Sequence, residues 1–400
     1  MLLHLCDPDN YEPIANSSHK EQIVNALGCL LEDQQQKNID TKIKLIKILF
    51  KKRQEEEQKR KQGNHHHKKT ISFDFYQDEI KYLWMNTDLD NKLSDIQLLE
   101  YKKAMVLYGP PGTGKTYSAK LLANSLVKRY FINRGSLPKE DEIKKHIAYL
   151  QFHVNYNYED FIAGQTIEDS TVKTKKGFIF NVIDKAKQAP DVPYVVILDE
   201  MNRTDVSRVF GELFTAIEKR GEDVELSLPD PINKRTTLTL NLPENIYFIG
   251  TMNEIDFSLE RIDFALRRRF IWQECGYSEE DLKDMIYHLF EKTIYPINNT
   301  DIVNYCDNCT VLNEMIKSKM DETYHIGHSF FAEIVNIYSK LKDNCINDKT
   351  WSKAKNILWQ ISIKPTLDAY CGTMSEEEKK QVMPDFEKAF FPEKKQEKAK

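Results

Sequence analysis

The sequence lacks any apolar stretch close to the roughly 20 residues that a membrane-spanning helix needs. Its first segment, MLLHLCDPDNYEP, has no basic start, no sustained apolar core and no small-residue cleavage site, so we expect no signal peptide. Seven cysteines scattered through 400 residues form no regular framework and predict reduced thiols. These absences argue against a disulfide-stapled secreted domain and predict a cytoplasmic protein that makes no membrane contact.

Signals for metal binding, nucleic-acid coating and DNA cleavage are also sparse. Cys306 and Cys309 form one CxxC pair without a second pair at zinc-ribbon spacing, so we interpret them as free thiols, with a metal site as the alternative. The net charge of −5 argues against nucleic acid bound along the whole chain. The basic run 42–69 is interpreted as a solvated helix face or linker, or as a local phosphate contact. No nuclease signature is convincing, so cleavage is not assigned to this chain.

The first 75 residues are expected to form a helical, charged region that contacts a partner or DNA. Ser18 and Glu21 have the spacing of a capping box and predict the start of a helix over 18–33. Apolar residues at spacings of four and three predict a second helix over 39–62. Its apolar stripe needs a partner surface, and a coiled coil is one interpretation. The tract QGNHHHKK that follows predicts a hinge, with histidines that serve as linker residues rather than metal ligands.

Strand and helix signals then alternate, a pattern typical of an α/β fold with a parallel sheet and crossover helices. Runs suited to buried strands are AMVLY (104–108), IAYLQF (147–152), YVVIL (194–198), IYFIGT (246–251) and FIW (270–272). After Ser278 only amphipathic stretches remain, at 278–292, 329–341 and 351–361. We therefore expect an α/β subdomain over 76–276, a helical lid over 277–390 and a charged tail over 391–400.

A phosphate-binding loop lies between the first of these strands and a helix. Residues 109–116 have the sequence GPPGTGKT, in the strand and helix context that gives this motif its meaning. Its glycines let successive amides point at a phosphate, and the helix adds its positive end. Lys115 is expected to neutralise phosphate oxygens, and the Thr116 hydroxyl to bind Mg²⁺. The expected nucleotide-binding residues are Gly109, Pro110, Pro111, Gly112, Thr113, Gly114, Lys115, Thr116 and Tyr117.

Carboxylates and an amide follow two later strands. Asp199 is expected to hold Mg²⁺ through its water shell, because this small hard cation prefers oxygen ligands and keeps several waters. Glu200 is placed to orient and polarise an attacking water. Asn253 is expected to hydrogen-bond the γ-phosphate or that water, and Asp256 to help hold it. Together with the loop, these residues predict a Mg²⁺-dependent nucleoside triphosphatase whose substrate is GTP or ATP.

Three consecutive arginines in ALRRRF (265–270) precede the last strand. One interpretation is a cluster of cations at a helix terminus, attracted by the helix dipole. In ring-forming nucleoside triphosphatases this location supplies an arginine finger to the neighbouring subunit, worth about 10³ to 10⁵ in rate. Arg268 is the first candidate for this role and Arg269 the second.

The order of these motifs resembles the AAA+ module of the McrB family. The segments GPPGTGKT, LDEMNRTDVSRVFGELFTAIE and IGTMNEIDFSLERIDFALRRRF carry the resemblance, and FHVNYNYEDFIAG (152–164) and YHIGHSFF (324–331) are similar to two more family segments. It covers about residues 100–372. The resemblance implies an AAA+ fold, a hexameric ring with nucleotide between subunits, GTP as the usual fuel, and a McrC-like partner that stimulates hydrolysis and carries the nuclease.

The family's water-positioning loop maps onto 252–258, where Phe257 replaces the expected Arg. This replacement loses a cation near the active site. Our leading hypothesis is a motor that couples nucleotide hydrolysis to DNA translocation in anti-phage restriction, while its partner cuts. DNA is contacted directly or through that partner, because 75 residues are few for a modified-base-binding domain.

Two other hypotheses remain. One is a MoxR- or dynein-like AAA+ ATPase that remodels proteins, which the FHVNYNYEDF and IGHSFF segments disfavour. The other is a nucleotide-gated assembly scaffold with slow hydrolysis, which Phe257 keeps open.

Overall fold

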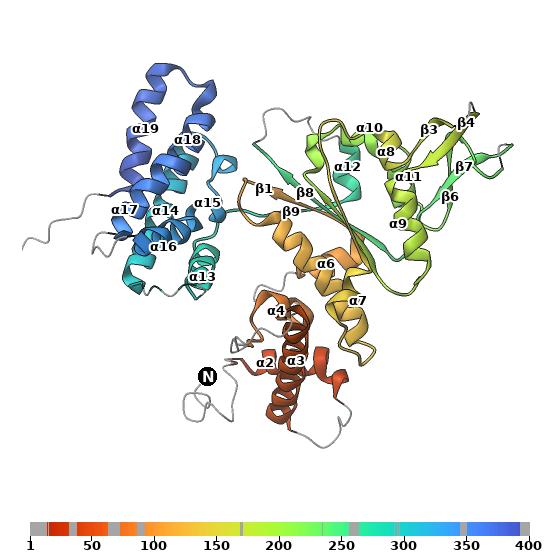
Figure 1. Ribbon diagram of the computed structural model, residues 1–400, viewed down its shortest axis with the longest axis horizontal. Helices are drawn as coiled ribbons and strands as arrows, with labels where there is room; N and C mark the ends of the chain where they lie inside the picture. Colours follow the sequence, from red (N-terminus) through yellow and green to blue (C-terminus); the bar gives the residue numbers. More distant parts are fainter. Residues whose placement is uncertain are drawn as a thin grey trace, which may run out of the picture. The chain divides into compact units, whose positions relative to one another are not determined.

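Figure 1 shows the computed structural model of the chain, coloured along the sequence. It describes residues 14, 16–31, 38–62, 73–85, 93–168, 171–233, 235–255, 264–291, 293, 295, 297–344 and 350–392. The chain divides into two compact units. The first comprises residues 1–107, 116–252 and 258–273, and the second comprises residues 108–115, 253–257 and 274–400.

A five-stranded sheet has the strand order β2-β5-β8-β1-β9. Its strands are β1 (Ala104–Gly109), β2 (Ile147–Gln151), β5 (Tyr194–Asp199), β8 (Ile246–Asn253) and β9 (Ile271–Glu274). Strand β5 pairs in parallel with β2 on one side and with β8 on the other. Every residue of β5 is buried, as expected for a parallel strand whose two faces are both covered. All five strands predicted from the sequence are confirmed.

The helices of this α/β part lie in the connections between the strands, apart from α5, which precedes β1. They are α5 (Asp95–Lys102), α6 (Lys115–Ile132), α7 (Glu140–Lys144), α8 (Tyr158–Phe161), α9 (Phe178–Lys187), α10 (Val206–Phe210), α11 (Leu213–Glu218) and α12 (Phe264–Arg269). Each crossover from one parallel strand to the next needs such a connection, because parallel strands cannot be joined by a tight turn. The arrangement is a P-loop α/β fold, as predicted.

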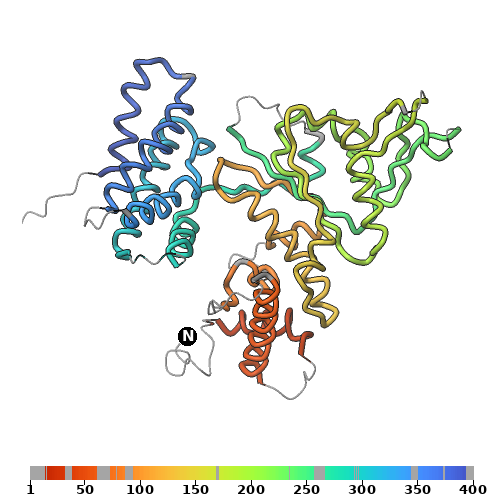
Figure 2. Tube along the Cα trace, in the orientation of Figure 1, coloured from red at the N-terminus to blue at the C-terminus, as the bar shows by residue number. Residues whose placement is uncertain are grey.

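Two antiparallel hairpins that the sequence did not predict also lie in the first unit. Strand β3 (Ala163–Glu168) pairs with β4 (Thr171–Lys176), and β6 (Asp223–Pro229) pairs with β7 (Thr237–Asn241). The hairpins lie side by side in Figures 1 and 2, and the Thr174 hydroxyl donates to the Pro229 carbonyl across 2.7 Å. Strand β4, with the sequence TVKTKK, is almost wholly exposed. It therefore lacks the apolar run by which a buried strand is recognised.

The N-terminal residues form three helices with a core of their own. The helices are α2 (Ser17–Leu27), α3 (Ile39–Gln62) and α4 (Asp78–Trp84). The bounds of α3 are those predicted, and its apolar stripe packs on α2 in this chain rather than in a coiled coil. The predicted capping box of Ser18 and Glu21 is wrong. Asn16 caps α2 instead, because the helix begins one residue earlier and the Asn16 side chain accepts from the Ser18 amide.

The N-terminal helices are fastened to the C-terminal end of α6. Ile132, the last residue of α6, belongs to the same apolar core as α2 and α3. The Cys29 thiol donates to the Ile132 carbonyl across 2.9 Å, and the Arg53 guanidinium donates to the Leu137 carbonyl across 2.6 Å. Backbone carbonyls and buried side chains thus fix this region to the first unit.

The second unit contains a helical bundle. Its helices are α13 (Glu279–Phe290), α14 (Asn299–Lys319), α15 (His328–Ala332), α16 (Ile334–Asn344), α17 (Thr350–Leu358), α18 (Lys364–Tyr370) and α19 (Glu376–Phe390), with a π-helical turn at Trp359–Ile363. The predicted helix over 329–341 is divided between α15 and α16. Cys306 and Cys309 are free thiols one turn apart on α14, buried in the core of the bundle. The helical C-terminal region expected from the sequence is confirmed.

Three of the sequence predictions fall on other parts of the chain. Residues 63–69 of the histidine tract, the loop residues Asp256 and Phe257, and residues 393–400 of the tail lie outside the described residues. In the described part of the chain, no helix is both long and apolar enough to cross a membrane.

Candidate nucleotide site

The carboxyl ends of β2, β5 and β8 meet at one edge of the sheet. The strand register pairs Gln151 with Asp199, and Leu198 with Gly250. Asp199, the last residue of β5, is only 4% exposed. A buried carboxylate is costly unless hydrogen bonds or a cation compensate its charge. This edge, where ligands of open α/β sheets bind, is therefore the place to look for its partners.

Three hydroxyl groups surround the Asp199 carboxylate. The Thr116 and Thr251 hydroxyls donate to Oδ1 across 2.8 Å and 2.6 Å. The Tyr149 hydroxyl donates to Oδ2 across 2.5 Å. Both carboxylate oxygens are therefore held by hydrogen bonds. The Thr116 hydroxyl at the start of α6 is in contact with the Asp199 carboxylate at the end of β5. Oxygen donors of this kind suit Mg²⁺, which is bound by one or two carboxylates and keeps several waters.

Tyr149 has no role in the sequence analysis beyond its place in an apolar strand. In the structure it is 44% exposed, and the Lys120 ammonium lies 5.0 Å from the centroid of its ring. Burial and the hydrogen bond to Asp199 raise the pKa of the Tyr149 phenol, so its hydroxyl remains a proton donor at neutral pH. The contact joins side chains 50 residues apart in the chain, and local pattern cannot reveal it.

Glu200 has an unusual backbone conformation. Its φ of 56° lies in the left-handed region, which costs a non-glycine residue about 1 to 3 kcal/mol. The Glu200 amide donates to the Thr251 hydroxyl across 3.1 Å, and its carboxylate accepts from Arg203 Nε across 3.2 Å. The Thr251 hydroxyl therefore contacts both consecutive acidic residues: it donates to the Asp199 carboxylate and accepts from the Glu200 amide. Neither Thr251 nor Arg203 was singled out from the sequence.

The phosphate loop belongs to the second unit. Lys115 is only 6% exposed, and its ammonium donates to the carbonyls of Gly109 and Pro110 across 3.1 Å and 2.5 Å. The loop thus presents a buried cation satisfied by its own backbone. Anionic phosphate oxygens are stronger acceptors than neutral carbonyls for such a group.

The curl of this loop depends on two glycines. Gly112 and Gly114 have φ values of +80° and +86°, which side-chain-bearing residues rarely adopt. The Thr113 hydroxyl between them donates to the Pro110 carbonyl across 2.9 Å and closes the turn. Tyr117, on the first turn of α6, is 58% exposed. The loop and helix start have the form of an anion-binding site.

Asn253 is the last residue of β8 and is half-buried. The amide of the next residue, Glu254, donates to the Gly109 carbonyl across 3.4 Å. The end of β8 therefore adjoins the phosphate loop within the second unit. Asp256, the other predicted water-holding residue, lies outside the described residues.

The two candidate finger arginines have different environments. The Arg268 side chain is 66% exposed and pairs with Glu218 at 3.1 Å. Arg269 is 8% exposed, donates to the Phe214 carbonyl across 2.9 Å and pairs with Glu218 at 2.9 Å. Arg269 is held within its own chain by α11. Separating the exposed pair of Arg268 and Glu218 would cost little, because exposed ion pairs contribute about 0 to 1 kcal/mol.

Comparison with known proteins places these residues in a family. The family described as AAA domain (dynein-related subfamily) matches residues 104–270. The chain is 33% identical over 282 residues to the EcoKMcrB subunit of a type IV methyl-directed restriction enzyme from Escherichia coli K12, covering 69% of this chain and 55% of that protein. It is 25% identical over 254 residues to YdiS, a component of the type II restriction enzyme BsuMI from Bacillus subtilis, covering 57% of this chain and 72% of that protein.

Among solved structures, a point mutant of RuvB from Thermotoga maritima is 17% identical, with a TM-score of 0.35, over 66% of this chain and 67% of that one. The match to the McrB subunit, in contrast, spans about half the length of that protein. Three observations identify the family of this chain: the phosphate loop, the hydrogen bonds from three hydroxyls to Asp199, and the match to the AAA domain. The chain is an AAA+ nucleoside triphosphatase of the McrB-like kind.

Proposed function

We propose that this chain is the motor subunit of an McrB-like restriction complex, in which it hydrolyses GTP or ATP and drives DNA translocation for a McrC-like nuclease. The observation that carries hydrolysis is the contact between Thr116 and Asp199 at the start of the loop helix. Similarity to EcoKMcrB and to a BsuMI component supports the restriction role. A cytoplasmic location and anti-phage defence belong to this proposal.

At the site, Thr116 and Asp199 would hold Mg²⁺ together with water and the nucleotide phosphates. When bound, this cation neutralises charge on the phosphate oxygens. Lys115 would exchange the carbonyls of Gly109 and Pro110 for phosphate oxygens. The other loop residues, from Pro111 to Gly114 and Tyr117, would contact the nucleotide through backbone amides and the first turn of α6.

Glu200 would orient the attacking water and polarise it by accepting a hydrogen bond from it. Asn253 and Asp256 would hold the same water. To do so, Glu200 must release Arg203, whose side chain is 47% exposed. An exposed pair of this kind costs about 1 kcal/mol or less to separate. The site is therefore built to change between a paired and a working glutamate at small cost.

Assembly as a hexameric ring would bring Arg268 to the nucleotide of a neighbouring subunit. In this arrangement Arg268 stabilises negative charge that develops on the transferred phosphoryl group. Arg269, which is buried against α11, would fix the orientation of α12 rather than reach another subunit. The two arginines then act as finger and support.

The chain would be organised as a charged helical region over 1–75, a nucleotide-binding subdomain over 76–276, a lid over 277–390 and a charged tail over 391–400. The apolar face of α3 packs within the chain, and its basic residues would contact a partner or DNA. DNA recognition would be direct or would lie with the nuclease partner.

The test begins with hydrolysis of GTP and ATP, measured side by side at matched Mg²⁺ concentrations. Lys115→Ala serves as the inactive control. The same assay is repeated with double-stranded DNA and with the product of the neighbouring reading frame, and translocation is measured by displacement of a third strand from DNA. Stimulation by the nuclease together with displacement supports the proposal. Hydrolysis that responds to neither DNA nor nuclease contradicts the motor role.

Protein remodelling is the second candidate, because the matching family is described as dynein-related. It predicts hydrolysis that a protein substrate stimulates and that DNA does not. A slow nucleotide-gated scaffold predicts ring assembly with bound nucleotide and turnover that stays low with every partner. The same set of assays separates these outcomes.

A further inference from the structure

One carboxylate, that of Glu218, pairs with two consecutive arginines of α12. Its Oε1 lies 3.1 Å from Arg268 Nη2, and its Oε2 lies 2.9 Å from Arg269 Nη2. Glu218 and Arg268 are 50 positions apart in the chain. The two oxygens of one planar group therefore set the relative positions of two neighbouring guanidinium groups.

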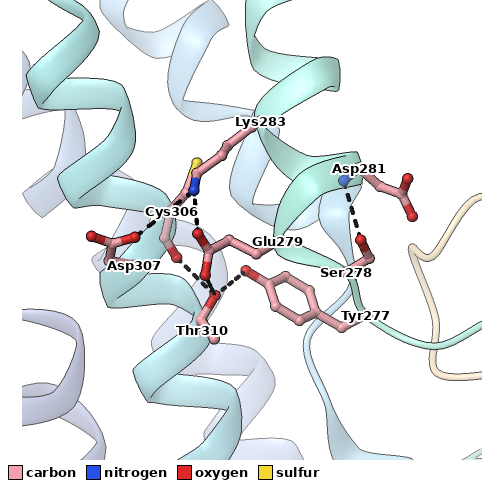
Figure 3. A network of polar contacts seen from close by, with 8 residues as sticks. All are labelled: Tyr277, Ser278, Glu279, Asp281, Lys283, Cys306, Asp307 and Thr310. Carbon is pink, nitrogen blue, oxygen red and sulfur yellow. Dashed lines mark hydrogen bonds and ion pairs between the residues drawn. The ribbon is translucent and has the colours of Figure 1, made fainter. Parts of the chain in front are cut away.

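Glu218 lies at an end of α11 that disfavours an acid. It is the last residue of this helix, where the negative end of the helix dipole repels a carboxylate. Glu279, shown in Figure 3, is the opposite case. It is the first residue of α13, where the dipole attracts its charge, and it pairs with Lys283 and accepts from the Thr310 hydroxyl across 2.8 Å. The position of Glu218 is thus explained by its two arginines rather than by its own helix.

Arg269 fixes one oxygen of the Glu218 carboxylate. It is 8% exposed, its Nε donates to the Phe214 carbonyl across 2.9 Å, and its guanidinium lies 5.1 Å from the centroid of the Phe214 ring. These two contacts to α11 determine where its Nη2 meets Oε2 of Glu218. Because the guanidinium is planar and rigid, its orientation also determines that of the carboxylate.

Arg268 contacts the same carboxylate from the exposed side. Its side chain is 66% exposed, and its Nη2 lies 3.1 Å from Oε1 and 3.4 Å from Oε2 of Glu218. A guanidinium has five N–H donors on three nitrogens, so it can bind a phosphate while Nη2 keeps its carboxylate. The exposed Arg267 lies instead over the ring of Trp272, 5.4 Å from its centroid. Of the two exposed arginines of α12, it is Arg268 that Glu218 orients.

We propose that Glu218 is a positioning residue that orients Arg268 towards the nucleotide of a neighbouring subunit. Arg269 holds the carboxylate, and the carboxylate fixes the rotamer of Arg268 before two subunits meet. Orientation fixed in advance lowers the entropy lost when Arg268 binds negative charge in the transition state. The inference rests on the proposed finger role of Arg268 and deepens it, because it names the residue on which that role depends. Glu218 itself touches no reacting atom.

Glu218→Gln is the principal variant. Its amide has the shape of the carboxylate and can still accept from Arg269, but it lacks the charge that attracts Arg268. Glu279→Gln is the matched control, because Glu279 is also a carboxylate shared by two side chains. Glu218→Asp is a second variant, which keeps the charge near Arg269 and withdraws it from Arg268 through a shorter side chain. Thermal unfolding and Mg²⁺-dependent hydrolysis of GTP and ATP are measured for the assembled full chain.

Glu218→Gln should lower kcat by about tenfold and change KM by less than about twofold, since a charged hydrogen bond shielded between assembled subunits is lost in the transition state. Glu279→Gln should hydrolyse nucleotide like the wild type. When Arg268→Ala is already present, adding Glu218→Gln should change kcat by less than about twofold, because the residue through which Glu218 acts is gone. A carboxylate that only stabilised the fold would lower the rate in both backgrounds.

Mixed rings test whether Glu218 acts across the boundary between subunits. A Lys115→Ala subunit has no working site of its own but presents an intact Glu218 and Arg268 to its neighbour. Hydrolysis per Glu218→Gln subunit should therefore rise severalfold as Lys115→Ala subunits are added, as expected for rings that contain Arg268→Ala. A defect confined to the subunit's own site would not be relieved.

Wild-type kcat in Glu218→Gln, together with slow hydrolysis by Arg268→Ala, would overturn the role of Glu218 and keep the finger. Normal hydrolysis by Arg268→Ala would overturn the finger, and the inference with it. Recovery in mixed rings of Arg268→Ala but not in those of Glu218→Gln would also contradict positioning. If neither Glu218 variant folds, Glu218 serves stability and the positioning role is refuted.

Discussion

Tyr149 donates a hydrogen bond across 2.5 Å to Asp199 Oδ2, from the strand beside the one that ends in the carboxylate. Thr116 and Thr251 both donate to the other oxygen, so among the described residues it is Tyr149 that fixes the carboxylate from the Oδ2 side. A carboxylate that is oriented before the cation arrives loses less freedom on binding it. We therefore expect Tyr149 to be a positioning residue for Mg²⁺.

Replacing Tyr149 with Phe should raise the Mg²⁺ concentration needed for half-maximal hydrolysis by about tenfold, since a hydrogen bond to a charged group contributes about 1.5 kcal/mol. The ring that faces Lys120 is retained, so unfolding should change little. Hydrolysis titrated with Mg²⁺ at saturating nucleotide measures the shift. Tyr295→Phe is the control, because the Tyr295 hydroxyl also donates to a carboxylate, Asp343, on the exposed lid surface. An unaltered Mg²⁺ requirement in Tyr149→Phe would contradict the assignment.

Glu200→Gln should abolish turnover while the chain still binds nucleotide. Loss of a positioned base typically costs about 10² to 10⁴ in rate, and the phosphate loop is untouched. Affinity for a fluorescent nucleotide and single-turnover hydrolysis measure the two effects separately. Lys115→Ala should instead lose binding, because it removes the loop cation. A Glu200→Gln chain with the binding defect of Lys115→Ala would refute the role given to Glu200.

Substitution of the two arginines of α12 should have different effects on hydrolysis and on stability. Arg268→Ala should fold normally and slow hydrolysis by about 10³-fold or more in the assembled ring. Arg269→Ala should lower the free energy of unfolding by about 1 to 3 kcal/mol, since it leaves the buried Phe214 carbonyl without its donor and removes one of the two arginines that pair with Glu218. Thermal unfolding and hydrolysis of both variants distinguish the two cases.

Mixed rings give the sharper test of Arg268. A ring that contains Arg268→Ala and Lys115→Ala subunits pairs an intact loop with an intact finger, so part of the activity should return. No recovery at any mixing ratio would count against an arginine that acts between subunits.

Lys355 in the lid should reduce stability at neutral pH. Burial lowers the pKa of its ammonium from 10.5 to about 8, although the faces of Phe390 and Phe391 lie 4.6 Å and 5.0 Å from Nζ. For a base with a lowered folded-state pKa, the cost is complete below pH 8 and disappears as the pH rises towards 10.5.

Lys355→Met should therefore stabilise the chain by about 1 to 3 kcal/mol at pH 7, with a smaller gain above pH 8. Chemical unfolding at several pH values measures the gain. Lys353→Met, an exposed position on the same helix, should change stability little at any pH. A gain that does not depend on pH would show that charge burial is not its source.

Local pattern predicts the parts of this fold that depend on continuous apolar sequence. The buried β5 and the amphipathic α3 are apparent from composition and periodicity alone. The phosphate loop is equally local, because its glycines, Lys115 and Thr116 are consecutive. Hairpin β3–β4 is missed, since β4 is exposed on both faces and has neither an apolar run nor a clean alternation.

Contacts between distant residues explain what remains. Nothing near Tyr149 indicates that its hydroxyl meets Asp199, and nothing near Ser329 indicates that its amide donates to the Gly112 carbonyl. Arg268 and Arg269 are adjacent and chemically identical in the sequence. Only the fold shows that one is buried against α11 and the other is exposed.

Helix α6 connects two regions that would otherwise act separately. Thr116 lies on its first turn, and Ile132 at its last residue belongs to the core of the N-terminal helices. An α-helix of 18 residues is about 27 Å long and transmits load along its axis with little bending. Force applied to α2 or α3 by a bound partner would thus act along α6 and reach the Thr116 hydroxyl that contacts Asp199. Helix α6 would then link the N-terminal region mechanically to the nucleotide site.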